Sequence, residues 1–318
     1  MSAKDSIVLK DFGSFFTGGG NFTLTDKSLY EASFVKGGPV RSVDPNGDFE
    51  TGQMYVQYYK LAEPTCRYPV LLWHGGGVTG ACWGSTPDGR AGWDKLFLQN
   101  GYDIYVSDAV ERGRAGWSRY PDIYETEPVF RSKQEAWINF RIGEQYSSVA
   151  SERVPLVATQ FPYEYFDMFM KQSVPRWTSN NAAIMAAYEE YIQRVGECIL
   201  VVHSQAGEFA GYIAQKYPQY IKALVMLEAS AVSSVYNSSA DVPTLYIWGD
   251  NIRAGSLWEK YRANVYEFFR RQQADGKQVK WLDLPAHGIC GNSHFLMLDK
   301  NSEAILALTV QWLDKVIR

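Results

Sequence analysis

The feature that most constrains this 318-residue sequence is the stretch from residue 198 to residue 217. It begins with an apolar, β-branched run at 198–203 that is short enough to be a buried strand. Directly after Ser204 and Gln205 it continues as a segment with helical spacing. A serine at such a strand-to-helix turn holds its hydroxyl above the carboxyl end of the sheet, at the N-terminus of the helix. The stretch indicates a nucleophilic serine, although Val202 and Ala206 replace the usual glycines and a serine helix cap would also fit.

Strands and helices alternate on both sides of this stretch. The expected strands span residues 53–59, 68–73, 102–107, 198–203, 221–227, 244–248 and 279–284. The expected helices span residues 93–100, 206–217, 256–273 and 301–318. Such alternation implies parallel βαβ units with right-handed crossovers. The first 60 residues are expected to form short strands, separated by the glycines at 18–20 and by a turn at 44–47.

The segment 111–194 interrupts the alternation. It contains no convincing buried strand, is rich in aromatic residues and is divided by prolines, and its clearest helix spans residues 180–192. A mainly helical insertion between two core strands is typical of a lid over an active site, although packing against another subunit would also explain it. We therefore expect a core domain of residues 1–110 and 195–318 and a lid of residues 111–194.

In an open parallel sheet, ligands bind beyond the carboxyl ends of the strands, so polar residues that directly follow strands are the candidates. In chain order these candidates are the glycine-rich loop at 74–77, Ser204, Glu228, Asp250, His287 and His294. The order is a donor loop, a nucleophile, an acid and a histidine. A hydrolytic triad of serine, acid and histidine has this order in one large class of parallel-sheet enzymes.

Each candidate type has a chemical task. A serine hydroxyl becomes a useful nucleophile when an imidazole accepts its proton, and a carboxylate on the other ring nitrogen fixes the imidazole tautomer. The oxyanion of the intermediate needs converging backbone N–H groups, for which we assign Gly76 or Gly77 together with Gln205. A phosphate-binding turn is a weaker explanation of the glycine loop, because no P-loop lysine follows it.

The residues alone leave the acid and the base open. Asp250 follows the strand that usually carries the acid, whereas Glu228 ends an apolar strand, where an unpaired charge would be costly. His287 and His294 share one loop, and we favour His294, which lies directly before the last helix. His203 is adjacent to the serine, so its side chain should point away and pack.

Several segments together resemble the α/β-hydrolase superfamily over nearly the whole chain. More narrowly, the chain resembles bacterial-type esterases whose acid is a glutamate after the sixth strand. The matching segments are His74-Gly-Gly-Gly with Thr79-Gly80, Arg112-Gly-Arg114, His203-Ser-Gln-Ala-Gly207, Glu228 and Gly291-Asn-Ser-His294. The resemblance implies an α/β-hydrolase fold, with a mostly parallel eight-stranded sheet flanked by helices. It also implies a triad of Ser204, Glu228 and His294, with Asp250 as the alternative acid outside it.

Composition narrows the function further. The net charge is −4 and no basic stripe stands out, so nucleic acid is not an expected partner. No apolar run is long enough to cross a membrane. Aromatic residues make up 15% of the chain, which favours an apolar or aromatic substrate of modest size. The cysteines have no metal spacing, and the sequence does not decide whether Cys66 and Cys82 are bridged.

We therefore expect a serine hydrolase of carboxylic esters or lactones that works through an acyl-enzyme and needs neither a cofactor nor a metal. The alternative is a non-hydrolytic protein of the same fold, such as a ligand receptor or a lyase or cyclase. The expected partners are a small-molecule ester or lactone and, in a possible homodimer, a second copy of the chain. The N-terminus lacks a signal-peptide core, which favours a cytoplasmic location unless a signal peptide has been removed.

Overall fold

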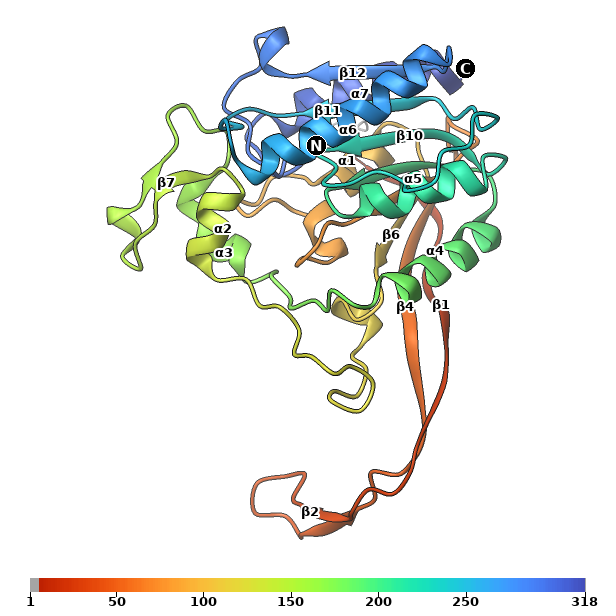
Figure 1. The fold of residues 1–318 in the computed structure, drawn as a ribbon, viewed down its shortest axis with the longest axis vertical. Helices are drawn as coiled ribbons and strands as arrows, with labels where there is room; N and C mark the ends of the chain where they lie inside the picture. The colour runs from red at the N-terminus through yellow and green to blue at the C-terminus, as the bar shows by residue number, and fades with distance from the viewer. Residues whose placement is uncertain (1–5, 318) are drawn as a thin grey trace.

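The computed structural model describes residues 6–317, which form a central sheet with helices on both faces (Figure 1). The eight strands of the sheet lie in the order β1-β4-β6-β5-β9-β10-β11-β12. They are β1 (Leu9–Leu24), β4 (Gly47–Leu61), β5 (Val70–Trp73), β6 (Ile104–Asp108), β9 (Cys198–His203), β10 (Ile221–Leu227), β11 (Thr244–Trp248) and β12 (Val279–Asp283). The strands from β6 to β12 run parallel, and β4 runs antiparallel to both of its neighbours. The predicted mostly parallel, eight-stranded sheet is confirmed.

The central strands are apolar throughout because both faces of the sheet are covered. Side chains alternate between the faces, so Leu72, Val201 and Val225 pack on one side and Leu71, Val202 and Met226 on the other. The first face is covered by α1 (Trp93–Gln99) and α7 (Ser302–Ile317). The second face is covered by α4 (Asn181–Val195), α5 (Ala206–Lys216) and α6 (Leu257–Ala274).

The N-terminal region differs from its prediction. Strands β1 and β4 form one long antiparallel hairpin that continues beyond the sheet as a narrow arm (Figure 1). Its outer end carries the short strands β2 (Tyr30–Ala32) and β3 (Arg41–Val43). The glycines at 18–20 do not form the expected turn. They lie inside β1, where a Cβ on Gly18 would come within 2.5 Å of the Cβ of Ala187 on α4, so glycine permits close packing there.

The insertion has two structurally different parts. Its first part holds α2 (Lys133–Asn139), β7 (Gly143–Gln145), β8 (Val154–Pro155) and α3 (Phe166–Met170), which lie beside the sheet (Figure 1). Its last part is α4, whose Ile184, Tyr188 and Tyr191 pack with β4 and β5 residues in the second face of the core. Helix α4 therefore covers the sheet itself, although we expected it to be part of a lid.

Most aromatic residues of the insertion are packed rather than open to solvent. Trp137, Phe161, Phe166 and Phe169 are almost fully buried and join the apolar cluster on the α7 side of the sheet. They interact edge to face, with the Trp137 and Phe166 ring centroids 4.9 Å apart. The aromatic abundance of this segment thus reflects a second layer of core beside the strand ends.

Candidate active site

Ser204 occupies the sharp turn between β9 and α5. Its φ of +55° is unusual for a residue other than glycine, and it lets the chain turn directly from the strand into the helix. The turn is fixed by backbone hydrogen bonds, because the Ser204 amide donates to Leu227 (3.0 Å) and its carbonyl accepts from Gly207 (3.0 Å) and Ser230 (3.1 Å). Ser204 as a whole is 9% exposed. It is thus tightly held without being sealed from solvent.

Positive φ values concentrate at this site. Among the described residues, seven that are not glycine have φ above zero, and Ser204, Glu228 (+47°) and Arg141 (+57°) are three of them. Such conformations cost about 1–3 kcal/mol each and persist where the surroundings enforce them, which is frequent at functional sites. The backbone is therefore strained at the residues that carry the polar groups described below.

Glu228 and His294 meet beyond the carboxyl ends of β10 and β12, the two strands that flank β11. Glu228 follows β10 directly and its side chain is fully buried, and His294 lies in the loop that leads to α7 and is 1% exposed. His294 Nδ1 lies 3.0 Å from Glu228 Oε2. A carboxylate can only accept, so Nδ1 carries the proton and Nε2 is left as an acceptor. This is the pairing that orients a catalytic imidazole.

The other oxygen of Glu228 is held by two further donors. Arg141 Nη2 donates to Glu228 Oε1 at 2.5 Å, and the Gly249 amide donates to the same oxygen at 2.7 Å. Arg141 is 5% exposed at its side chain and also donates through Nε to the Asp250 carbonyl (2.7 Å). A buried carboxylate needs such partners to stay ionised. The insertion thus supplies the counter-ion of Glu228.

The loop that carries His294 is held in place by hydrogen bonds to two buried side chains, Asp299 and His203. Asp299 is fully buried and accepts hydrogen bonds from the Asn292 side chain, the Ser293 amide and the Ser293 hydroxyl, at 2.7–2.9 Å. His203 Nε2 donates to the His294 carbonyl (2.9 Å). His203, expected only to pack, therefore also fixes the backbone of the histidine loop.

The two alternative candidates lie elsewhere in the network. Asp250 follows β11, but its Oδ2 accepts from the Gly291 amide (2.9 Å), so it braces the start of the histidine loop. His287 is exposed, and its Nδ1 lies 2.9 Å from the Asp283 carbonyl at the end of β12. The structure brings His294 to Glu228 and leaves Asp250 and His287 outside that pair.

The glycine loop after β5 lies against the serine turn. A Cβ on Gly75 would come within 2.9 Å of the Ser204 Cβ, and one on Gly76 within 2.8 Å of Gln205 Oε1, so side chains would prevent this approach. Within residues 6–317 the structure records no hydrogen-bond partner for the backbone amides of Gly76, Gly77 and Gln205. Amides of this kind beside a serine are suited to bind an oxyanion.

Two further motifs of the sequence hold this loop in place. His74 Nδ1 donates to the Gly75 carbonyl (2.8 Å) while its Nε2 accepts from the Ala109 amide (3.0 Å), and burial lowers the pKa of its ring to about 4. Asp108 accepts from the Gly80 amide (2.7 Å) and from Arg114 Nε (2.7 Å), which ties the Thr79-Gly80 turn to the Arg112–Arg114 loop. These residues are structural supports of the site.

The ionisation of His294 is set mainly by its burial. Burial lowers the pKa of the ring well below its usual value, and the Arg141 and Arg131 cations lower it further. The ring is therefore neutral near pH 7, as a general base must be. The Ser204 hydroxyl makes no hydrogen bond to this ring in the structure. Such catalytic contacts are often long without substrate and tighten when it binds.

Aromatic side chains enclose His294, and sequence reasoning missed them. The Phe140 ring stacks on the imidazole with centroids 5.6 Å apart, and the Trp258 ring lies 4.0 Å away. Arg141 and Asp299 were also missed. Phe140 and Arg141 lie in an insertion without periodicity, and Trp258 lies on an ordinary amphipathic helix. No local pattern in the sequence distinguishes any of them from structural residues.

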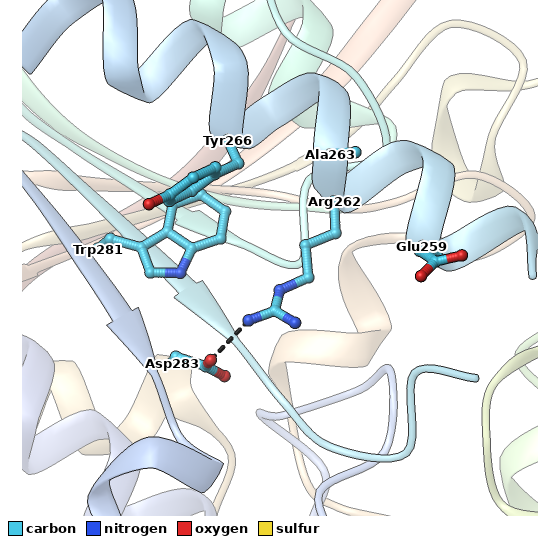
Figure 2. Close-up of a pocket in the computed structure, with 6 residues that line it drawn as sticks. All are labelled: Glu259, Arg262, Ala263, Tyr266, Trp281 and Asp283. Carbon is cyan, nitrogen blue, oxygen red and sulfur yellow. Dashed lines mark hydrogen bonds and ion pairs between the residues drawn. The ribbon is translucent and has the colours of Figure 1, made fainter. Parts of the chain in front are cut away.

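A separate surface pocket of about 420 Å³ lies between α6 and the edge strand β12 (Figure 2). Tyr266 and Trp281 form one wall, and Arg262 donates to Asp283 (2.5 Å) across it. None of the candidate catalytic residues lines this pocket. It is distinct from the serine site.

Comparison with known proteins agrees with the fold. No protein-family profile matches the sequence. The chain is similar to a protein of Fungal sp. (strain ATCC 74256) named "Probable secreted lipase phiG", with 25% identity over 333 residues that cover 85% of this chain and 88% of the relative. It is also similar to a solved structure described as a novel bacterial esterase, with 29% identity, a TM-score of 0.83 and 98% of each chain covered.

Proposed function

Because the chain belongs to the α/β-hydrolase superfamily, we propose that it is a serine hydrolase that cleaves carboxylic esters or lactones through an acyl-enzyme. The observation that carries this proposal is the 3.0 Å contact between His294 Nδ1 and Glu228 Oε2, at the strand ends beside the strained turn of Ser204. The names of the two similar proteins, a lipase and an esterase, support an ester substrate.

The proposed reaction assigns one task to each group. Ser204 Oγ attacks the carbonyl carbon while His294 Nε2 takes its proton, and Glu228 stabilises the imidazolium that forms. The amides of Gly76 or Gly77 and of Gln205 donate to the oxyanion, each worth about 10²–10³ in rate. His294 then returns the proton to the leaving alcohol. Water activated by the same ring releases the acid and restores the serine.

The rings of Phe140 and Trp258 beside His294 support a substrate with an apolar or aromatic body of modest size. The partners expected from the sequence, a small-molecule ester or lactone and a second copy of the chain, remain predictions. The cytoplasmic location also remains a prediction, and the fungal relative is named as secreted. Within residues 6–317 no helix is both long and apolar enough to cross a membrane.

The test of the nucleophile is Ser204→Ala. We expect it to lower turnover of p-nitrophenyl butyrate by about 10⁴-fold or more, because the acyl-enzyme cannot form. Mass spectrometry after incubation with a fluorophosphonate should show one adduct, on Ser204, in the natural chain and none in the variant. Unchanged thermal unfolding of the variant is the control for folding. Turnover that survives the substitution, or an adduct on another residue, would refute the assignment, and an adduct without turnover would favour the non-hydrolytic alternative.

A further inference from the structure

Arg176 of the insertion lies against the glycine loop beside the serine turn. Its Nη1 would come within 2.1 Å of a Cβ on Gly76, and it donates to Gln205 Oε1 at 3.1 Å. Both of these neighbours belong to the proposed oxyanion hole. The guanidinium therefore lies next to the place where the substrate carbonyl would bind.

The backbone around Arg176 is fixed in this position. Arg176 exchanges two backbone hydrogen bonds with Val129 (2.7 and 3.1 Å), and the Val174 amide donates to the Gly77 carbonyl (3.0 Å). Arg112, which is 1% exposed, donates through Nη1 to the Pro175 carbonyl (3.4 Å). A segment tied to the glycine loop and to its neighbours holds the arginine in place before any ligand arrives.

Arg176 differs from Arg141 and Arg131 because no carboxylate in the described chain forms an ion pair with it. Arg141 pairs with Glu228, and Arg131 pairs with Glu135. The Arg176 side chain is partly buried, and of its five N–H donors one has a recorded protein partner, the neutral amide oxygen of Gln205. A partly buried guanidinium without a counter-ion is suited to a planar anion that can accept two hydrogen bonds.

The positive charge at this position is not a consequence of the overall composition. The chain carries a net charge of −4, yet Arg176 lies beside the serine turn and close to the Arg112 cation, and neither arginine forms an ion pair with a carboxylate of the described chain. The carboxylate of the site, Glu228, is already neutralised by Arg141. A neutral ester would leave the Arg176 guanidinium without a direct ion pair, whereas an anionic ester would supply one.

We propose that Arg176 is a specificity-determining residue that binds a carboxylate on the ester substrate, so that the natural substrates are esters with an apolar body and a free carboxylate. This inference rests on the proposed function. The carboxylate occupies either the acyl or the alcohol part of the ester, and the guanidinium binds it through paired N–H donors. Binding there places the scissile carbonyl beside the amides of Gly76 and Gln205.

The test compares a charged and a neutral substrate in Arg176→Met. The acyl-side probe is p-nitrophenyl hemisuccinate, matched with p-nitrophenyl butyrate, and the alcohol-side probe is 4-carboxyphenyl butyrate, matched with phenyl butyrate. Loss of a charge-assisted hydrogen bond should lower the ratio of kcat/KM for the charged ester to that for its neutral match by about 10- to 100-fold in one of the two pairs. Arg176→Lys should show a ratio between those of Arg176→Met and the natural chain. Lysine keeps the positive charge but cannot donate two parallel hydrogen bonds to one carboxylate as the planar guanidinium can.

Arg262→Met is the matched control, because it removes the same charge from the pocket of Figure 2, outside the serine site. Its ratio should stay within about 3-fold of that of the natural chain, since screened charges at a distance contribute little.

If Arg176→Met lowers kcat/KM equally for both esters of each pair, Arg176 only positions Gln205 and the inference is overturned. Turnover of neutral esters by the natural chain would leave the proposed function standing in that case. Absence of any turnover and of any fluorophosphonate adduct would instead remove the proposed function itself.

Discussion

The strand-end loops of the sheet and the first part of the insertion, residues 111–180, both supply polar side chains to the site, but they do so in different ways. The loops supply Ser204, Glu228 and His294, which the parallel topology brings to one edge of the sheet. The insertion supplies Arg141 and Arg176, which approach the same place from outside the sheet. The strand-end residues are suited to catalysis, whereas the arginines of the insertion determine the charge around them.

This difference explains how much of the site was predictable. A candidate such as Glu228 could be found from the sequence because it ends an apolar run, and strand ends in such a sheet converge. The elbow serine was found for the same reason, and the strands around it lie within a few residues of the predicted ranges. The geometry also favours Glu228 over Asp250, which the residues alone left open.

Arg141 and Arg176 could not be found in this way. The insertion has no repeating apolar period, so the position of a residue in the sequence does not reveal which way its side chain points. Their placement depends on tertiary contacts such as the Val129–Arg176 bridge, which joins residues 47 positions apart. The arm was missed for a related reason, because the glycines at 18–20 signal a turn in the sequence but lie inside β1, where Gly18 packs closely against α4.

The contrast between the strand-end loops and the insertion depends on Glu228 being the acid of the triad. We expect Glu228→Gln to lower kcat by about 10³–10⁴-fold, because the imidazole loses its charged partner, as in other triads. Asp250→Asn should lower it by less than about 10-fold, because an amide oxygen can still accept from Gly291. The measurement is steady-state hydrolysis of p-nitrophenyl butyrate, with thermal unfolding of both variants as the control. A larger loss in the Asp250 variant would reverse the assignment.

The variant Arg141→Met tests whether the insertion stabilises the buried Glu228 carboxylate and lowers the pKa of His294. The substitution leaves the fully buried Glu228 carboxylate without its cation, which should cost about 3–5 kcal/mol in the free energy of unfolding. Because Arg141 also lowers the pKa of His294, the acid limb of the kcat/KM profile should move to higher pH. Urea unfolding and the pH profile measure the two effects.

Arg67→Met is the control for Arg141→Met, because Arg67 forms an exposed pair with Glu197, in which the arginine side chain is 78% exposed. Its expected cost is below about 1 kcal/mol. If both variants lose the same stability, the insertion cannot be said to hold the acid through a buried ion pair. An acid limb that stays in place would show that Arg141 does not act on His294.

The smallest expected effect concerns Asp299, which holds the histidine loop through Asn292 and Ser293. Burial raises the pKa of Asp299 from 3.8 to about 6 in the folded chain. Below pH 3.8 the group is protonated in both the folded and the unfolded chain. Between pH 3.8 and about 6 the unfolded chain releases the proton first, so the stability contribution of this group is lost as the pH rises through that window.

The loss amounts to about 3 kcal/mol, since each pKa unit corresponds to about 1.4 kcal/mol. Asp299→Asn is neutral at every pH, so the unfolding free energy of the variant minus that of the natural chain should rise by about this amount from pH 4 to pH 7. A constant offset is expected as well, because an amide replaces one of the acceptors of Ser293 and Asn292. Urea unfolding at several pH values separates the slope from the offset. A difference that does not change with pH would mean that Asp299 stays ionised in the folded chain, in which case the three donors of the histidine loop outweigh the cost of burial.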